Sequence, residues 1–167
     1  MNYSDILSRN IVELPKSGIR KFFDLLENMK DVVSLTVGQP DFVTPWHIRE
    51  AGIESLEQGK TYYTSNAGTP ALREEIDRYL SRRFGVSYDP KSEIIVTVGG
   101  SEAIDLAVRA VVEPGDEVII PEPSFVCYEP IVRMAHGNPV IVETKSEDHF
   151  KLTPDALRRA ITKKTKM

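Results

Sequence analysis

Near the start of the chain, apolar residues recur at the spacing of one face of a helix. An extended run over residues 32–37 follows, and it ends at Gly38-Gln39-Pro40-Asp41, where glycine and proline predict a loop. The amphipathic helix before it is predicted over residues 17–29, with its apolar positions three and four residues apart at Ile19, Phe22, Phe23, Leu26 and Met29.

Two further helices are predicted from the signals at their ends. Thr44-Pro45 offers a capping residue followed by proline at the first helical position, and Gly59 is the expected left-handed stop of a helix over 45–58. Thr69-Pro70 repeats the start signal, and Gly85 is its stop. The apolar face of this second helix is predicted at Leu72, Ile76, Tyr79 and Leu80.

From residue 94 the pattern changes to short apolar runs. Ile94–Val98 is continuously β-branched, as in a strand that helices cover on both faces. The runs 118–120 and 139–142 predict two more strands. Helices are predicted from Gly100 to the Pro114-Gly115 stop, over 125–135, and after Thr153-Pro154. The alternation predicts an α/β fold with a mostly parallel sheet flanked by helices.

Composition places the chain among ordinary globular proteins. Of 167 residues, 41% are hydrophobic and 28% charged. No apolar run approaches the roughly 20 residues that span a bilayer, and no secretory signal is readable at the start. The lone Cys127 leaves no internal disulfide, which fits a reducing compartment. We therefore expect a cytoplasmic protein without a membrane role.

Charge and histidine spacing argue against two other classes of function. The net charge of −4 gives no basic field for nucleic acid, and we expect the cationic run 163–166 to be a solvated helix end. His47, His136 and His149 have no ligand-like spacing to one another or to Cys127, so no metal site is predicted.

The segment Thr97–Ala103 runs from a predicted strand through two glycines straight into a helix. Such a turn gathers free backbone N–H groups and the positive end of the helix dipole, and Ser101 adds a hydroxyl. This suits a phosphate group, although a tight turn without a ligand explains the glycines equally well. The segment matches neither the dinucleotide nor the P-loop pattern, which disfavours a nucleotide.

Six segments follow one another in the sequence: Ser17–Arg20, Val37–Phe42, Tyr63–Gly68 with Leu72-Arg73, Thr97–Ala103, Pro114–Val118 and Pro121–Phe125. In this order they resemble class I and II aminotransferases of fold type I, the aspartate aminotransferase superfamily, which use pyridoxal 5'-phosphate (PLP). The resemblance extends over essentially the whole chain.

The resemblance implies the N-terminal part of this fold, with its sheet incomplete. Residues 1–44 would begin the small domain, and residues 45–167 would begin the large PLP-binding domain. The implied activity is transfer of an amino group from an amino acid to a 2-oxo acid. Two alternatives stay open: another PLP reaction on the same scaffold, such as C–S β-elimination, and a non-catalytic binding or dimerisation module.

The resemblance also implies a cofactor site. Gly100, Ser101 and Glu102 would offer backbone N–H groups, with the Ser101 hydroxyl, to the PLP phosphate. Phe125 matches an aromatic position that stacks on the pyridine ring, and a phenyl ring keeps the stacking without a hydrogen bond. Taken without the resemblance, Phe125 would be interpreted as a core aromatic.

Two further positions belong to the implied site. Tyr63 matches a tyrosine that reaches from one subunit to the phosphate held by the other, so a homodimer is expected. Gly38 would place its backbone near the substrate carboxylate. Outside the resemblance, Tyr63 is interpreted as a half-buried surface tyrosine and Gly38 as a turn glycine.

The residues that complete the family's chemistry are not found in this sequence. No lysine has the S-x-x-K setting of the lysine that binds PLP covalently, and Asn138-Pro139-Val140 is not the N-P-T/G-G segment. The pyridine-binding aspartate and the carboxylate-binding arginine are expected further along. We therefore predict no catalytic residue here and no activity for these 167 residues alone, with Ile94–Val98 lacking a neighbouring strand.

Overall fold

The computed structural model describes residues 6–14, 33, 38 and 40–167. They belong to two compact units, one formed by Met1–Gly18 with Val98–Met167 and the other by Ile19–Thr97. The helix predicted over 17–29 and most of the run 32–37 lie outside the described residues. The predicted domain boundary after residue 44 stays a prediction.

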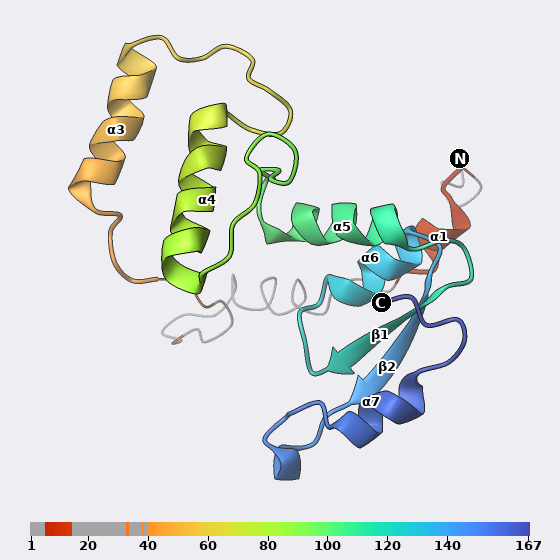
Figure 1. Cartoon of the computed structure of the whole chain (residues 1–167). Coiled ribbons are helices and arrows are strands. Elements are labelled where there is room, and N and C mark those ends of the chain that lie inside the picture. Colours follow the sequence, from red (N-terminus) through yellow and green to blue (C-terminus); the bar gives the residue numbers. More distant parts are fainter. Residues whose placement is uncertain (1–5, 15–32, 34–37, 39) are drawn as a thin grey trace. The chain divides into compact units, whose positions relative to one another are not determined.

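The first unit is built on a parallel pair of strands. β1 (Glu117–Glu122) pairs with β2 (Asn138–Glu143), with Glu117 opposite Asn138 and Glu122 opposite Glu143. The chain passes from one strand to the other through α6 (Tyr128–Met134), as parallel strands require (Figure 1). Both predicted strands are confirmed, whereas the helix predicted over 125–135 begins three residues later.

The other edge of β1 is also paired, by residues after the last helix. The N–H of Glu117 donates to the Lys164 carbonyl, and the N–H of Lys166 donates to the Glu117 carbonyl, both at 2.8 Å. The prediction that 163–166 is a helix end is therefore wrong. The helix stops at Ala160, and these residues satisfy backbone groups of β1 that would otherwise lack partners.

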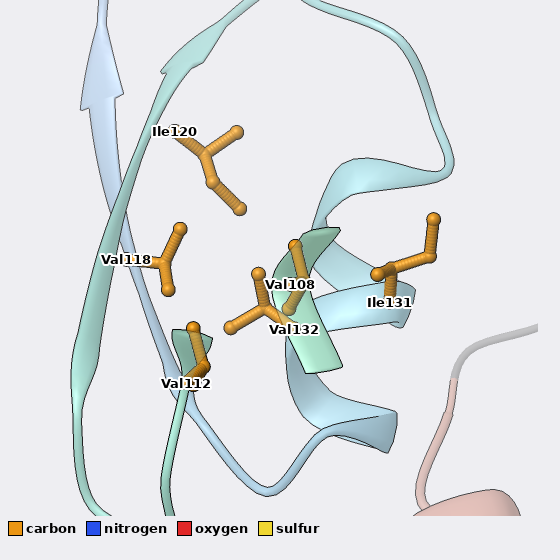
Figure 2. Packing of buried hydrophobic residues seen from close by; sticks show 6 residues of the cluster. All are labelled: Val108, Val112, Val118, Ile120, Ile131 and Val132. Carbon is orange, nitrogen blue, oxygen red and sulfur yellow. The ribbon is translucent and has the colours of Figure 1, made fainter. Parts of the chain in front are cut away.

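The core lies between β1 and two helices. Val118 and Ile120 project from β1 toward Val108 of α5 (Gly100–Val111) and Val132 of α6 (Figure 2). The buried residues on β1 alternate because side chains of a strand point to opposite faces in turn. Val132 is only 1% exposed, which places it at the centre of the cluster. The core thus fixes α5 and β1, whose ends form the candidate site.

Three short elements complete this unit. α7 (Pro154–Ala160) contacts β2 on the side opposite α6 (Figure 1). Its start is as predicted, because the Thr153 hydroxyl accepts a hydrogen bond from the N–H of Ala156 at 3.2 Å. α1 (Arg9–Val12) contacts α6, and the 3-10 helix η2 (Ser146–Asp148) follows β2. The sequence signals did not predict α1 or η2.

The second unit contains α3 (Trp46–Glu57) and α4 (Pro70–Phe84). Both stops are confirmed, because Gly59 and Gly85 have φ angles of 67° and 69°. Thr69 caps α4 by accepting from the Leu72 N–H at 3.4 Å, whereas α3 has Pro45 at its cap position and no side-chain cap. Both helices therefore end at glycines in the left-handed conformation that glycine adopts easily.

The predicted apolar face of α4 is not buried. Leu72 and Tyr79 are 46% and 50% exposed, and the buried side chain of this helix is Arg73. The helical spacing was predicted correctly. The partner surface that the apolar positions call for is not found among the described residues.

The predicted strand Ile94–Val98 is not a strand in the structure. Ile94 is buried, but Ile95 and Val98 are 66% and 91% exposed. The N–H of Val96 donates to the Ala67 carbonyl at 3.0 Å, and no strand among the described residues pairs with this segment. A strand forms only when its ladder has a partner. The expectation that this segment lacks its neighbouring strand stays a prediction.

Gly52 and Gly85 should respond in opposite ways to substitution by alanine. In both places an added Cβ meets no atom within 4 Å, so only the backbone differs. Gly52 lies inside α3, where alanine should stabilise the protein by about 1 kcal/mol. At Gly85 the positive φ should make alanine destabilising by about 1 kcal/mol. Urea unfolding measures both changes, and shifts of the same sign would contradict the expectation.

Candidate functional site

Unpartnered backbone donors gather where α5 begins. Gly99 precedes the helix with φ 82° and ψ 171°, a conformation that suits glycine. The N–H groups of Gly100, Ser101 and Glu102 have no intrahelical acceptor, and they donate to no acceptor in the described part of the chain. The Ser101 hydroxyl also makes no hydrogen bond there. The donors predicted from the glycine turn are therefore available to an anion.

The Glu102 side chain does not compete for these donors. Its carboxylate turns back and accepts a hydrogen bond from the N–H of Val98, before the helix. A carboxylate in the first turn of a helix is also stabilised by the positive end of the helix dipole. Glu102 thus fixes the entry into α5 and leaves its own N–H exposed.

A pocket of about 810 Å³ opens beside this helix start. Its walls come from the face of α5 that carries Ser101, Asp105 and Arg109, the end of β1, the loop 123–127 and α6. Ser101, Glu102 and Phe125 all line it, so the structure brings together predicted site residues that are more than twenty positions apart in sequence. Gly100 adjoins the lining through Ser101.

Phe125 presents an accessible ring to this pocket. Its side chain is 48% exposed, and its ring packs edge-on against Tyr128 with the ring centres 5.7 Å apart. The interpretation of Phe125 as a core aromatic is therefore wrong. A half-exposed aromatic ring in a pocket wall can stack on a flat ligand.

Charged side chains also line the pocket, and sequence reasoning missed them. Asp105 and Arg109 lie four and eight residues beyond Ser101 on the same face of α5, a spacing that could have revealed them. They form an ion pair at 2.9 Å, and the hydrogen bond that Arg109 donates to the Asp105 carboxylate raises the pKa of Arg109. The Glu129 carboxylate, also in the lining, binds Arg133 at 2.8 Å.

Tyr63 and Gly38 belong to the second compact unit. Tyr63 is fully exposed, so it is not the half-buried tyrosine of the alternative interpretation. Gly38 is also exposed, and a Cβ placed on it would meet no atom within 4 Å. Their proposed contacts with phosphate and substrate stay predictions.

Neither a metal cluster nor a membrane-spanning helix is found in the described part of the chain. No group of three His, Cys, Asp or Glu side chains there could hold a metal ion. Among the same residues, no helix is long and apolar enough to cross a membrane.

Comparison with known proteins finds aminotransferases among the relatives of this chain. The family model "Aminotransferase class I and II" matches residues 30–167. YugH of Bacillus subtilis, which is named as an aminotransferase, is 58% identical over 160 residues, covering 96% of this chain and 42% of its own. The aspartate aminotransferase of Pyrococcus abyssi is 46% identical over 150 residues, covering 90% of this chain and 39% of its own.

Solved structures show the same likeness. The aspartate aminotransferase of Thermus thermophilus with maleate aligns with a TM-score of 0.86 and 42% identity, covering 95% of this chain and 42% of that one. The chain therefore spans about two fifths of the length of the relatives that it matches.

Proposed function

Because this chain belongs to the family of class I and II aminotransferases, we propose that the whole protein is a PLP-dependent enzyme that transfers an amino group from an amino acid to a 2-oxo acid. Relatives named as aspartate aminotransferases support the reaction class. The observation that carries the proposal is local. Three unpartnered N–H groups lie at a helix start, and two of their residues, Ser101 and Glu102, line one pocket with the accessible ring of Phe125.

The residues of this chain fit the phosphate and ring of the cofactor. Gly100, Ser101 and Glu102 would bind the phosphate through their N–H groups, because these donors have no protein acceptor in the described chain. The Ser101 hydroxyl would add a donor, and the Phe125 ring would stack on the pyridine ring. PLP, when bound, supplies an electron-accepting ring that stabilises negative charge at the α-carbon of the substrate.

The charged wall limits where the phosphate can lie. Asp105 is neutralised by Arg109 and Glu129 by Arg133, while Glu102 is held by the Val98 N–H. Glu122 also lines the pocket. A phosphate is therefore favoured at the helix start, where the dipole and N–H groups meet, over the part of the wall that carries the Glu122 carboxylate.

A second copy of the chain would complete the site. We propose a cytoplasmic homodimer in which Tyr63 contacts the phosphate bound to the partner copy and Gly38 lies near the substrate carboxylate. The full exposure of the Tyr63 side chain supports a role outside its own chain.

Amino transfer by the whole protein tests the proposal. We expect the protein, incubated with PLP, aspartate and 2-oxoglutarate, to form glutamate at a rate that depends on both substrates. The 167-residue chain alone is the matched control and should be inactive, because none of its lysines has the S-x-x-K setting. Replacing aspartate by other amino acids identifies the donor.

Two other outcomes would replace the proposal. Release of ammonia and pyruvate from a cysteine conjugate, without a 2-oxo acid, would assign C–S β-elimination. Absence of PLP binding, together with a stable dimer, would assign a non-catalytic dimerisation module.

A further inference from the structure

The segment that carries Tyr63 also contains Gly68, to which the proposed function gives no role. Gly68 has a φ of 94°, and a Cβ placed on it would lie 2.7 Å from Cγ2 and 2.8 Å from Cβ of Val96. Both the backbone conformation and the contact with Val96 exclude a larger side chain. The turn before α4 therefore packs directly against the segment 94–97.

Hydrogen bonds fix the same contact. The N–H of Val96 donates to the Ala67 carbonyl at 3.0 Å, and the N–H of Gly68 donates to the Ser65 carbonyl at 2.9 Å. The turn Ser65–Gly68 is thus closed on itself and tied to Val96. Tyr63 stands two residues before this turn.

Arg73 holds the chain that leads into Val96. Its side chain is 8% exposed, and its Nη1 group donates to the carbonyl of Pro90 and, at 3.2 Å, to that of Lys91. It forms no ion pair with a described carboxylate, although its charge adds to the hydrogen bonds from Ser92 and Lys91 in lowering the pKa of Asp89. Its buried Nε–H has no acceptor. A buried guanidinium with an unsatisfied donor is costly. The hydrogen bonds to the Pro90 and Lys91 carbonyls explain why the Arg73 side chain is buried.

We propose that Gly68 and Arg73 are positioning residues for Tyr63. Together they clamp residues 90–96 onto the start of α4, and the clamped turn Ser65–Gly68 sets where Tyr63 projects. Tyr63 is fully exposed and makes no hydrogen bond in the described chain, so the turn is what orients it. This inference rests on the proposed function, from which it takes the contact between Tyr63 and the phosphate.

The test compares binding of two ligands to the whole protein, pyridoxal phosphate and pyridoxal, by spectral titration. Tyr63→Phe should weaken binding of pyridoxal phosphate about tenfold, as expected for loss of a hydrogen bond to a charged group, and leave pyridoxal unchanged. Gly68→Ala and Arg73→Met should produce the same phosphate-specific loss.

Double variants separate positioning from general stability. In the Tyr63→Phe background, Gly68→Ala and Arg73→Met should cause no further loss, because a misplaced phenylalanine has no hydrogen bond to lose. The inference would be overturned if Gly68→Ala and Arg73→Met weakened binding of both ligands equally. It would also be overturned if they lowered the affinity for pyridoxal phosphate in the Tyr63→Phe background as much as in the unchanged protein. Gly52→Ala and Arg78→Met are the matched controls, since Gly52 meets no atom and Arg78 lies exposed on α4, and both should bind like the unchanged protein.

A conservative variant keeps the test decisive if Arg73→Met fails to fold. The ammonium of Arg73→Lys can keep one of the two carbonyl contacts. This variant should therefore bind pyridoxal phosphate less tightly than the unchanged protein and more tightly than Arg73→Met. Hydrogen exchange at the Val96 N–H should likewise be slower than in Arg73→Met and faster than in the unchanged protein. If Arg73→Lys shows the hydrogen exchange and the affinity of the unchanged protein, the inference that Arg73 positions Tyr63 is overturned. If Tyr63→Phe binds both ligands normally, the role of Tyr63 in the proposed function fails first and this inference with it.

Discussion

Replacing Gly100 by proline is expected to weaken binding of pyridoxal phosphate about tenfold or more, because a hydrogen bond to a charged group contributes about 1.5–3 kcal/mol. Proline is tolerated at the first position of a helix, where the N–H has no intrahelical acceptor. The preceding Gly99 has a ψ of 171°, which a following proline accepts. The substitution therefore removes one donor and keeps the helix.

The matched ligand is pyridoxal, which lacks the phosphate and should bind to Gly100→Pro almost as before. Ser101→Ala provides a second comparison, since it removes only the hydroxyl and should cause a smaller loss. Both affinities are measured by spectral titration of the whole protein, with circular dichroism to check helix content. Equal losses for the two ligands would show that the backbone donors do not bind the phosphate.

Replacing Ile120 by alanine should lower the free energy of unfolding by about 2–5 kcal/mol, the range for emptying a buried isoleucine site. Ile120 is 3% exposed and projects from β1 into the cluster with Val108 and Val132 (Figure 2). The strand and the two helices hold the cavity open, because each is fixed by its own backbone hydrogen bonds. Urea unfolding followed by circular dichroism measures the loss.

Ile141 on β2 is the control, since the same substitution removes the same atoms from a side chain that is 39% exposed. We expect Ile141→Ala to cost less than half as much as Ile120→Ala. Similar losses at the two positions would mean that the core does not lie between β1 and the helices α5 and α6.

The candidate site shows where sequence reasoning succeeds. The glycine turn before α5 was predicted from its residues, because glycines followed by helix-forming residues specify a helix start locally. The starts of α4 and α7 and the stops at Gly59 and Gly85 were predictable for the same reason. Each depends on contacts within a few residues.

The charged side chains of the pocket wall show where sequence reasoning fails. Asp105 and Arg109 carry no motif, and their place beside Phe125 depends on how α5 packs against β1 and α6. Arg73 resembles a surface residue of an amphipathic helix, yet it is buried because two carbonyls from a distant turn surround it.

By itself the sequence determined the starts of α4 and α7, the stops at Gly59 and Gly85, the strands β1 and β2 and the family to which the chain belongs, because caps, β-branched runs and ordered motifs are local signals. The tertiary structure alone decided that Ile94–Val98 is not a strand, that residues 164–166 pair with β1, and that Ser101 and Phe125 share one pocket. Each of these depends on a partner far away in the sequence, since backbone groups and side chains take their final place only against the neighbour that satisfies them.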